Sequence, residues 1–174
     1  MYHNIKFKEA VKNIETKNEV KIIDGIKLLR ESGKPEAVKL ITNLLNTEIS
    51  EEVKKECINF LNDIKDQMAI KYIDAAINSK PGKELLRILV SCAWQNNLDF
   101  SMHLETFVRI VLKEEYLIAF EAFTVIENNI DKLPADKANH IENMISTGLK
   151  SANKEKQPMI KELIEVIKDV KKTQ

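Results

Sequence analysis

Two stretches of the sequence match each other position by position at a fixed distance of 32 residues, without a gap. Residues 28–41 read LLRESGKPEAVKLI, and residues 60–73 read FLNDIKDQMAIKYI. Weaker copies follow at a distance of 34, where Ile73 falls on Phe107 and Ile141. A period of this length is typical of chains built from stacked supersecondary units, so it constrains the fold more than any other feature.

Apolar residues recur at spacings of three and four almost throughout, and strand-like alternation is absent. Short connections of two to five residues require neighbouring helices to run antiparallel. Ser50 is expected to cap one helix at its start, Pro35 to open another, and Gly148 to cap a third at its end. The pattern predicts ten helices, at about 5–15, 19–31, 35–45, 50–64, 67–78, 81–95, 100–112, 115–128, 134–148 and 157–171.

The length of 174 residues, with 44% apolar and 31% charged residues, indicates one soluble domain with a sizeable core. We expect this single domain to span residues 1–174. Residues 1–18 form an N-terminal cap helix, residues 19–150 the helix-pair repeats, and residues 151–174 a C-terminal cap helix.

The segment 52–73 resembles a HEAT repeat. A Val followed by a basic residue opens its first helix, a small residue follows one turn later, and an Asp precedes the second helix. The residues that carry the resemblance are Val53, Lys54, Cys57, Leu61, Asp66, Ala69 and Ile70. The resemblance implies an all-α fold, a right-handed α-α superhelix (HEAT/armadillo-like solenoid) of about four helix pairs with capping helices. Armadillo-like and irregular arrays of helix pairs are the alternatives.

Stacking explains why such a chain would repeat, because a single helix pair leaves a broad apolar face that only a neighbour can cover. Interior helices should then be apolar on several sides, and the terminal ones should have one apolar stripe. Residues 85–94 and 116–126 are apolar in this way and lie in the middle of the chain. Both segments are therefore interpreted as parts of interior helices.

The resemblance also implies a binding surface, because the second helices of HEAT-like pairs line the concave face that commonly holds the ligand. Trp94 stands apart, as either a core residue or a half-exposed anchor for a partner. The outward positions mix charges and amides, which suits a protein or peptide better than a polyanion, although an ordinary solvated face has the same composition. The candidate partner-binding residues are Lys39, Asn43, Lys71, Asp74, Glu105, Arg109, Asn139, Asn143 and Trp94. Ala75 lies at the position of the repeat that Asn43, Arg109 and Asn143 occupy in the other copies.

Residues that would carry chemistry are scattered. His3, His103 and His140 share no helical turn, and no paired Cys motif or Gly-rich phosphate loop occurs. Cys57 and Cys92 lie among apolar neighbours and are interpreted as core thiols in a reducing compartment. The sequence therefore predicts no catalytic residue, no metal site and no cofactor.

We accordingly expect a non-catalytic adaptor or scaffold that binds a protein or peptide. A nucleic-acid-binding HEAT-like protein and a HEAT-like lyase or glycosylase are the alternatives. Basic and acidic residues number 27 each, which gives no general attraction to nucleic acid or anionic lipid.

The chain shows no signal peptide and no membrane span, so a cytoplasmic location is expected. Only three of the 27 basic residues are Arg, a bias that hints at a bacterial source. A monomer or weak homo-oligomer is expected, with the apolar stripe of residues 160–167 either sealing the end of the array or meeting a second copy.

Overall fold

The computed structural model describes the backbone of residues 2–173 and the side chains of residues 5–172. Within that part of the chain there are ten α-helices, three short 3-10 helices and no strand, so the predicted all-α class is confirmed. The α-helices are α1 (Tyr2–Ile14), α2 (Glu19–Ser32), α3 (Ala37–Leu45), α4 (Glu51–Asp63), α5 (Ile70–Asn78), α6 (Lys83–Gln95), α7 (Leu104–Lys113), α8 (Tyr116–Glu127), α9 (Ala135–Leu149) and α10 (Gln157–Thr173). The 3-10 helices are η1 (Gln67–Ala69), η2 (Ser101–His103) and η3 (Ile130–Lys132).

The chain divides into two compact units, Met1–Leu98 and Asp99–Gln174. The first unit contains α1 to α6, and the second contains α7 to α10. That residues 1–174 form a single domain remains a prediction.

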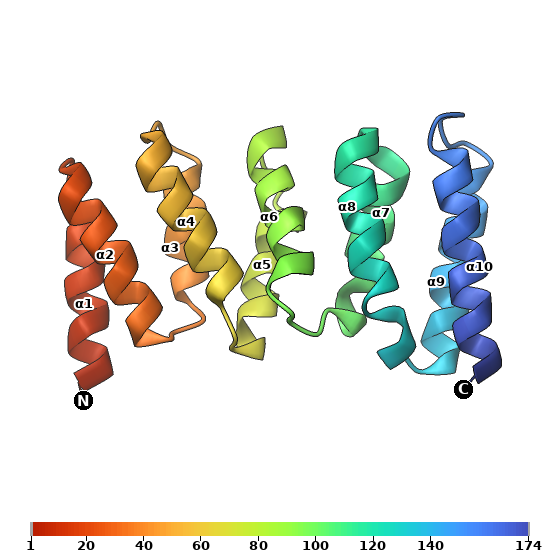
Figure 1. Cartoon of the computed structure of the whole chain (residues 1–174), viewed down its shortest axis with the longest axis horizontal. Helices are drawn as coiled ribbons and strands as arrows, with labels where there is room; N and C mark the ends of the chain where they lie inside the picture. The colour runs from red at the N-terminus through yellow and green to blue at the C-terminus, as the bar shows by residue number, and fades with distance from the viewer. Residues whose placement is uncertain (1, 174) are drawn as a thin grey trace. The chain divides into compact units, whose positions relative to one another are not determined.

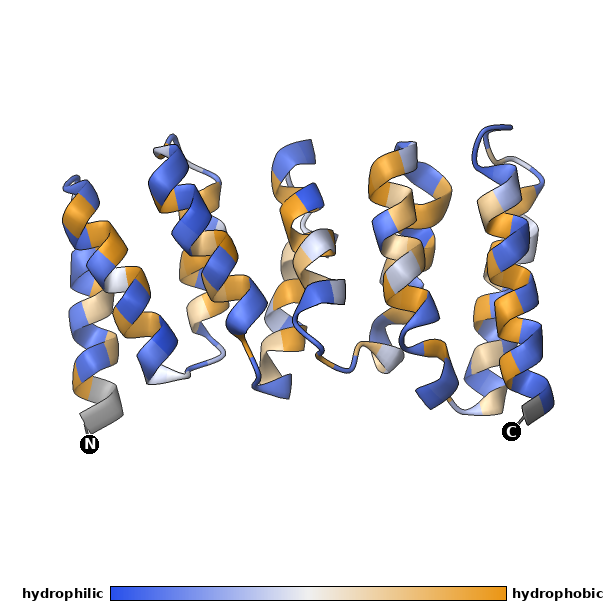
Figure 2. Ribbon diagram, viewed as in Figure 1, coloured by the Kyte–Doolittle hydropathy of each residue, from blue (hydrophilic) through white to orange (hydrophobic). Residues whose placement is uncertain are grey.

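Alternate helices pack side by side in the first unit (Figure 1). One row consists of α2, α4 and α6, and the other contains α3 and α5. The rows also touch each other, because α3 packs against α4 and α5 against α6, while α1 covers α2. Most helices carry both hydrophobic and hydrophilic residues around their circumference, as such two-layer packing requires (Figure 2).

Burial in the first unit follows the 32-residue repeat. Several matched positions lie in the core together, and Lys39 and Lys71 are both exposed. Sequence periodicity therefore corresponds to equivalent packing. The matched buried pairs are Leu29 with Leu61, Ala37 with Ala69, Val38 with Ile70, and Ile41 with Ile73.

The second unit has the same kind of packing. α7 lies tightly against α8, and α9 lies against α10. α7 also packs beside α9, and α8 beside α10, so this unit too consists of two rows. Three apolar pairs matched at a distance of 34 are buried, namely Leu104 with Ala138, Phe107 with Ile141, and Val111 with Ile145.

Two helix starts show how well local signals work. The Ser50 hydroxyl accepts a hydrogen bond from the Val53 backbone N–H at 3.3 Å, which confirms the predicted cap of α4. α3, in contrast, begins at Ala37 rather than at Pro35. The reason is a tight turn in which the Ala37 N–H donates to the Lys34 carbonyl at 3.1 Å.

Gly148 does not cap α9, contrary to the sequence prediction, because the helix continues to Leu149. Its role is close packing instead. A Cβ atom at Gly148 would lie 2.4 Å from Cδ1 of Leu112, so the glycine lets α9 approach α7.

Both cysteines are buried and free, as the sequence analysis expected. Cys57 is fully buried on α4, and Cys92 lies in the core on α6. Burial raises the pKa of the Cys57 thiol from its ordinary value of 9.0 to about 12, and the nearby Glu56 acts in the same direction. The thiol of Cys57 therefore stays protonated in the folded chain at neutral pH.

We predict that Gly25→Ala destabilises the protein. A Cβ atom there would lie 2.9 Å from the carbonyl oxygen of Ala10, so α1 would have to move away from α2. We expect this strain to outweigh the gain in helix propensity and to cost about 1–2 kcal/mol, measured by urea denaturation. Gly82→Ala is the control, because a Cβ there meets nothing within 4 Å. Equal or higher stability of the Gly25 variant would contradict this account of α1 packing.

We also predict that neither thiol reacts with Ellman's reagent in the folded protein at pH 8 and that both react after unfolding in guanidinium chloride. Rapid labelling of the native chain would contradict this prediction.

The raised pKa of Cys57 also predicts how stability depends on pH. Because the pKa of the thiol is higher in the folded state than in the unfolded state, the stabilisation by the protonated thiol is complete below pH 9 and is lost as the pH rises towards 12. The free energy of unfolding should therefore fall less over this range in Cys57→Ala than in the parent.

Candidate partner-binding surface

The structure places four of the predicted partner-binding residues on two adjacent helices of the first unit. Lys39 and Asn43 lie on α3, and Lys71 and Asp74 lie on α5. All are exposed except Asp74, which is half-buried. Because α3 and α5 pack side by side, these residues belong to one row of helices, which we call the α3–α5 face.

Tyr72 organises the α3–α5 face, although the sequence analysis did not select it. The Nζ atom of Lys39 lies 5.2 Å from the centre of the Tyr72 ring, and that of Lys71 lies 4.9 Å from it. Both ammonium groups are therefore within cation–π range of one half-buried ring. The ring restrains two long side chains that would otherwise be mobile, and so it concentrates positive charge at one place.

The second unit brings the other predicted positions together on α7 and α9. Glu105 and Arg109 lie on α7 and form an ion pair at 3.8 Å. The Nε2 atom of His140, on α9, lies 3.4 Å from the other carboxylate oxygen of Glu105. Asn139 and Asn143 are exposed on the same helix. We call this group of residues the α7–α9 face.

A shallow groove runs beside the α7–α9 face. It has a volume of about 480 Å³ and is mostly apolar in its lining. Arg109 also donates to the Thr106 hydroxyl at 3.0 Å, which holds the guanidinium near this edge of the unit. The face therefore combines charged groups with an apolar depression, which is lined by Leu112, His140, Asn143, Met144, Thr147 and Gly148.

Trp94 is not a fully buried core residue, since 39% of its surface is exposed. It lies near the end of α6, which belongs to the other row of the first unit. The structure thus places Trp94 on a different row of helices from Lys39 and Lys71.

The first unit contains a cavity of about 310 Å³, at the turns that join α2 to α3 and α4 to α5. Apolar side chains such as Leu29 and Phe60 line it together with charged ones. Arg30 at its edge is bound to Asp63 and lies 3.6 Å from Glu56. Two of the charged side chains that line the cavity, Arg30 and Asp63, are therefore paired with each other.

The apolar segment 116–126 is not covered on every side. It was interpreted as part of an interior helix because it is almost entirely apolar, yet Tyr116, Leu117 and Phe120 are exposed. Only the opposite side of α8 is covered, by α7 and α10. The apolar run therefore combines a core-facing side with an apolar surface side.

Lys156 is buried, with 5% of its surface exposed, and its role is structural. The ammonium group donates to three carbonyl oxygens at the end of α7, those of Val111 at 3.0 Å, Leu112 at 3.0 Å and Glu114 at 2.6 Å. Burial lowers the pKa of Lys156, while the charge of Glu114 opposes that change. The lysine acts as a cap on the carbonyl end of α7 from the turn before α10.

Among the residues with described side chains, no group of three or more His, Cys, Asp or Glu residues is placed to hold a metal ion. His3, which the sequence analysis considered as a ligand, lies outside those residues. None of the described helices has the length and apolar character needed to cross a membrane.

Comparison with known proteins adds nothing to these observations: no protein-family model, curated protein or solved structure matches the chain.

We predict that Lys156→Met lowers the free energy of unfolding by about 2–3 kcal/mol, because it keeps the apolar stem and removes the three hydrogen bonds to α7. Lys161→Met is the matched control on an exposed position and should change stability by less than about 0.5 kcal/mol. Urea denaturation of both variants checks the prediction. Equal stability of the two variants would show that the hydrogen bonds of Lys156 to α7 do not stabilise the fold.

Proposed function

We propose that this chain is a HEAT-like α-solenoid that acts as a non-catalytic protein-interaction module. Its partner is a protein or peptide. The partner is bound by the second helix of each sequence repeat, namely α3, α5, α7 and α9, which would form the concave side of such an array. The support for the array is the packing of alternate helices within each unit, together with the sequence repeat and its equivalent burial.

The observation that carries the proposed binding role is the Tyr72 ring with Lys39 and Lys71 against it. An aromatic ring with restrained cations is an anchor of the kind found at the centres of protein interfaces. Half-buried Tyr72 presents little flexible surface, so ordering it on binding costs little conformational entropy.

The chemistry of this anchor indicates the partner. Two ammonium groups next to a ring fit a segment in which a carboxylate lies beside an apolar or aromatic side chain. Exposed Asn43 adds an amide that can bind to the backbone of an extended peptide. We therefore infer an acidic peptide segment as the ligand of the α3–α5 face.

The mixed charge of the α7–α9 face favours a protein partner over a nucleic acid. Glu105 lies between Arg109 and His140, so a phosphate backbone along this face would meet a carboxylate. A continuous basic groove is what a duplex would require.

The test is selection of random peptides displayed on phage against the full chain, followed by affinity measurement with fluorescence anisotropy. We expect enriched peptides to combine Asp or Glu with an apolar residue. The double variant Lys39→Glu/Lys71→Glu should weaken them by at least about tenfold, which is about 1.4 kcal/mol. Tyr72→Ala should weaken them to a similar degree.

The matched control is Lys27→Glu/Lys55→Glu, which makes the same change in net charge at exposed positions on α2 and α4. Its affinities should stay within about twofold of the parent. Failure to enrich any peptide that depends on the α3–α5 face would contradict the proposal. Binding of a short DNA at low salt, lost in the same double variant, would instead favour the nucleic-acid alternative.

A further inference from the structure

The outward side of α8 is an exposed apolar strip. Its members are Tyr116, Leu117 and Phe120, with 39%, 71% and 50% of their surfaces exposed. They occupy the first turns of the helix, and Thr124 continues the same side one turn later. Contiguous exposed apolar groups of this size mark interaction surfaces more often than single exposed residues do.

The strip is held rigidly by ring stacking. The rings of Tyr116 and Phe120 are 6.4 Å apart and nearly parallel, and those of Phe120 and Phe123 are 6.2 Å apart and parallel within 1°. Phe123 is buried in the core. Because the exposed rings rest on a core ring, the strip is preformed, and little side-chain freedom is lost when a partner covers it.

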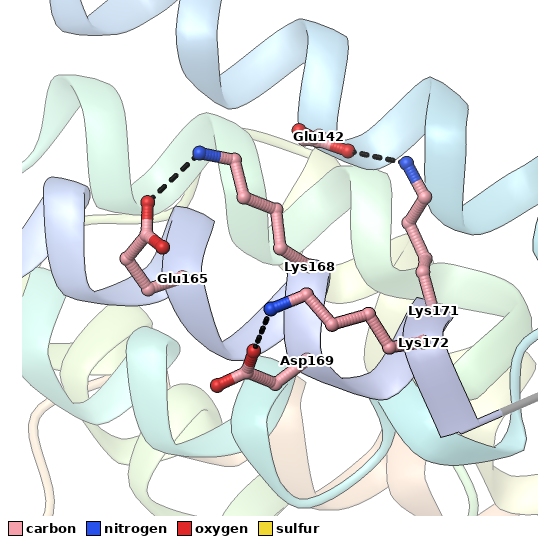
Figure 3. Close-up of polar contacts among 6 residues, drawn as sticks. All are labelled: Glu142, Glu165, Lys168, Asp169, Lys171 and Lys172. Atoms are coloured by element: carbon pink, nitrogen blue, oxygen red, sulfur yellow. Dashed lines mark hydrogen bonds and ion pairs between the residues drawn. The ribbon is translucent and has the colours of Figure 1, made fainter.

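α10 shows what an ordinary outward side looks like in the same unit. It packs beside α8, and its exposed side carries charged residues that pair with one another. Lys168 binds Glu165 at 2.8 Å, and Lys172 binds Asp169 at 2.7 Å (Figure 3). The apolar outward side of α8 is therefore a local departure from the pattern of its neighbour.

The charged residues between positions 114 and 131, on α8 and directly beside it in the chain, are all acidic. From Glu114 to Asp131 the sequence contains five carboxylates and no Lys, Arg or His. Glu115 and Glu127 are exposed at the two ends of α8, about 18 Å apart along the helix. Buried Lys156 lies beside Glu114, at the end of α7. The apolar strip is thus bounded by negative charge at both ends.

We propose that the α8 strip is a docking surface for a basic amphipathic helix. The apolar side of that helix covers Tyr116, Leu117 and Phe120, and its Lys or Arg residues lie opposite Glu115 and Glu127. A second copy of this chain fits the strip poorly, because it would bring identical carboxylates together. An anionic membrane surface is disfavoured for the same reason. The α8 strip shares no residue with the α3–α5 face, so this proposal stands independently of the function proposed above.

The test uses the full chain and two fluorescein-labelled peptides of 18 residues with the same Leu-rich apolar side. One peptide carries Lys on its polar side, and the other carries Glu. We expect the Lys peptide to bind with a micromolar Kd in fluorescence anisotropy at 50 mM NaCl, and to bind more weakly at 300 mM. The Glu peptide should bind at least about tenfold more weakly than the Lys peptide.

Variants locate the binding. Leu117→Ala/Phe120→Ala should weaken the Lys peptide by at least about tenfold, and circular dichroism should show an unchanged fold because both residues are exposed. Glu115→Gln/Glu127→Gln should reduce the dependence of Kd on salt. Lys161→Ala/Glu165→Ala on the outward side of α10 is the matched control and should leave Kd within about twofold.

Four outcomes of these measurements, and a fifth from a vesicle-binding experiment, would overturn the proposal. The first four are equal affinity for the Lys and Glu peptides, no binding of the Lys peptide, binding that the α8 variants leave unchanged, and a parent chain that dimerises through the strip in analytical ultracentrifugation. Binding to phosphatidylglycerol vesicles that is lost in Leu117→Ala/Phe120→Ala would likewise assign the strip to a membrane surface.

Discussion

Side-by-side packing of alternate helices is the interaction on which the rest of the structure depends. Within each unit most helices touch an adjacent helix of the chain and also the helix two places along. An apolar face that one hairpin leaves open is covered by the next hairpin, so the energy of burial is shared between neighbours. This arrangement frees the outer side of each helix from packing, and the outer sides are where the surfaces of interest lie.

The two proposed surfaces differ in chemistry, and each lies on a different unit of the chain. The α3–α5 face has restrained cations around Tyr72, while the α8 strip is apolar and bounded by carboxylates. One scaffold thus presents two surfaces of opposite character, each supported by core residues of its own unit. If both proposals hold, the two surfaces would bind two different partners, in keeping with the adaptor role proposed above.

Much of the fold could be predicted from the sequence, because helical periodicity and the repeat act over short distances along the chain. The buried pair Ile41 and Ile73, for instance, follows from apolar spacing alone. The exposure of Leu117 and Phe120 could not be predicted, since composition does not say which side of an apolar helix has a neighbour. The role of Tyr72 could not be predicted either, because its contact with Lys39 forms between two helices. The repeat did place Lys39 and Lys71 in equivalent positions. The aromatic residue next to Lys71 was the sequence signal that could have identified the cluster.

The three hydrogen bonds of Lys156 have a consequence for how the second unit holds together. They join the turn before its last helix to the end of its first helix, more than 40 residues earlier in the sequence. These bonds therefore connect the last hairpin of the unit to its first helix. A chain shortened after α8 would leave the carbonyl groups of α7 without this donor, so the C-terminal hairpin is an integral part of the unit rather than an appendage that evolution could trim without loss.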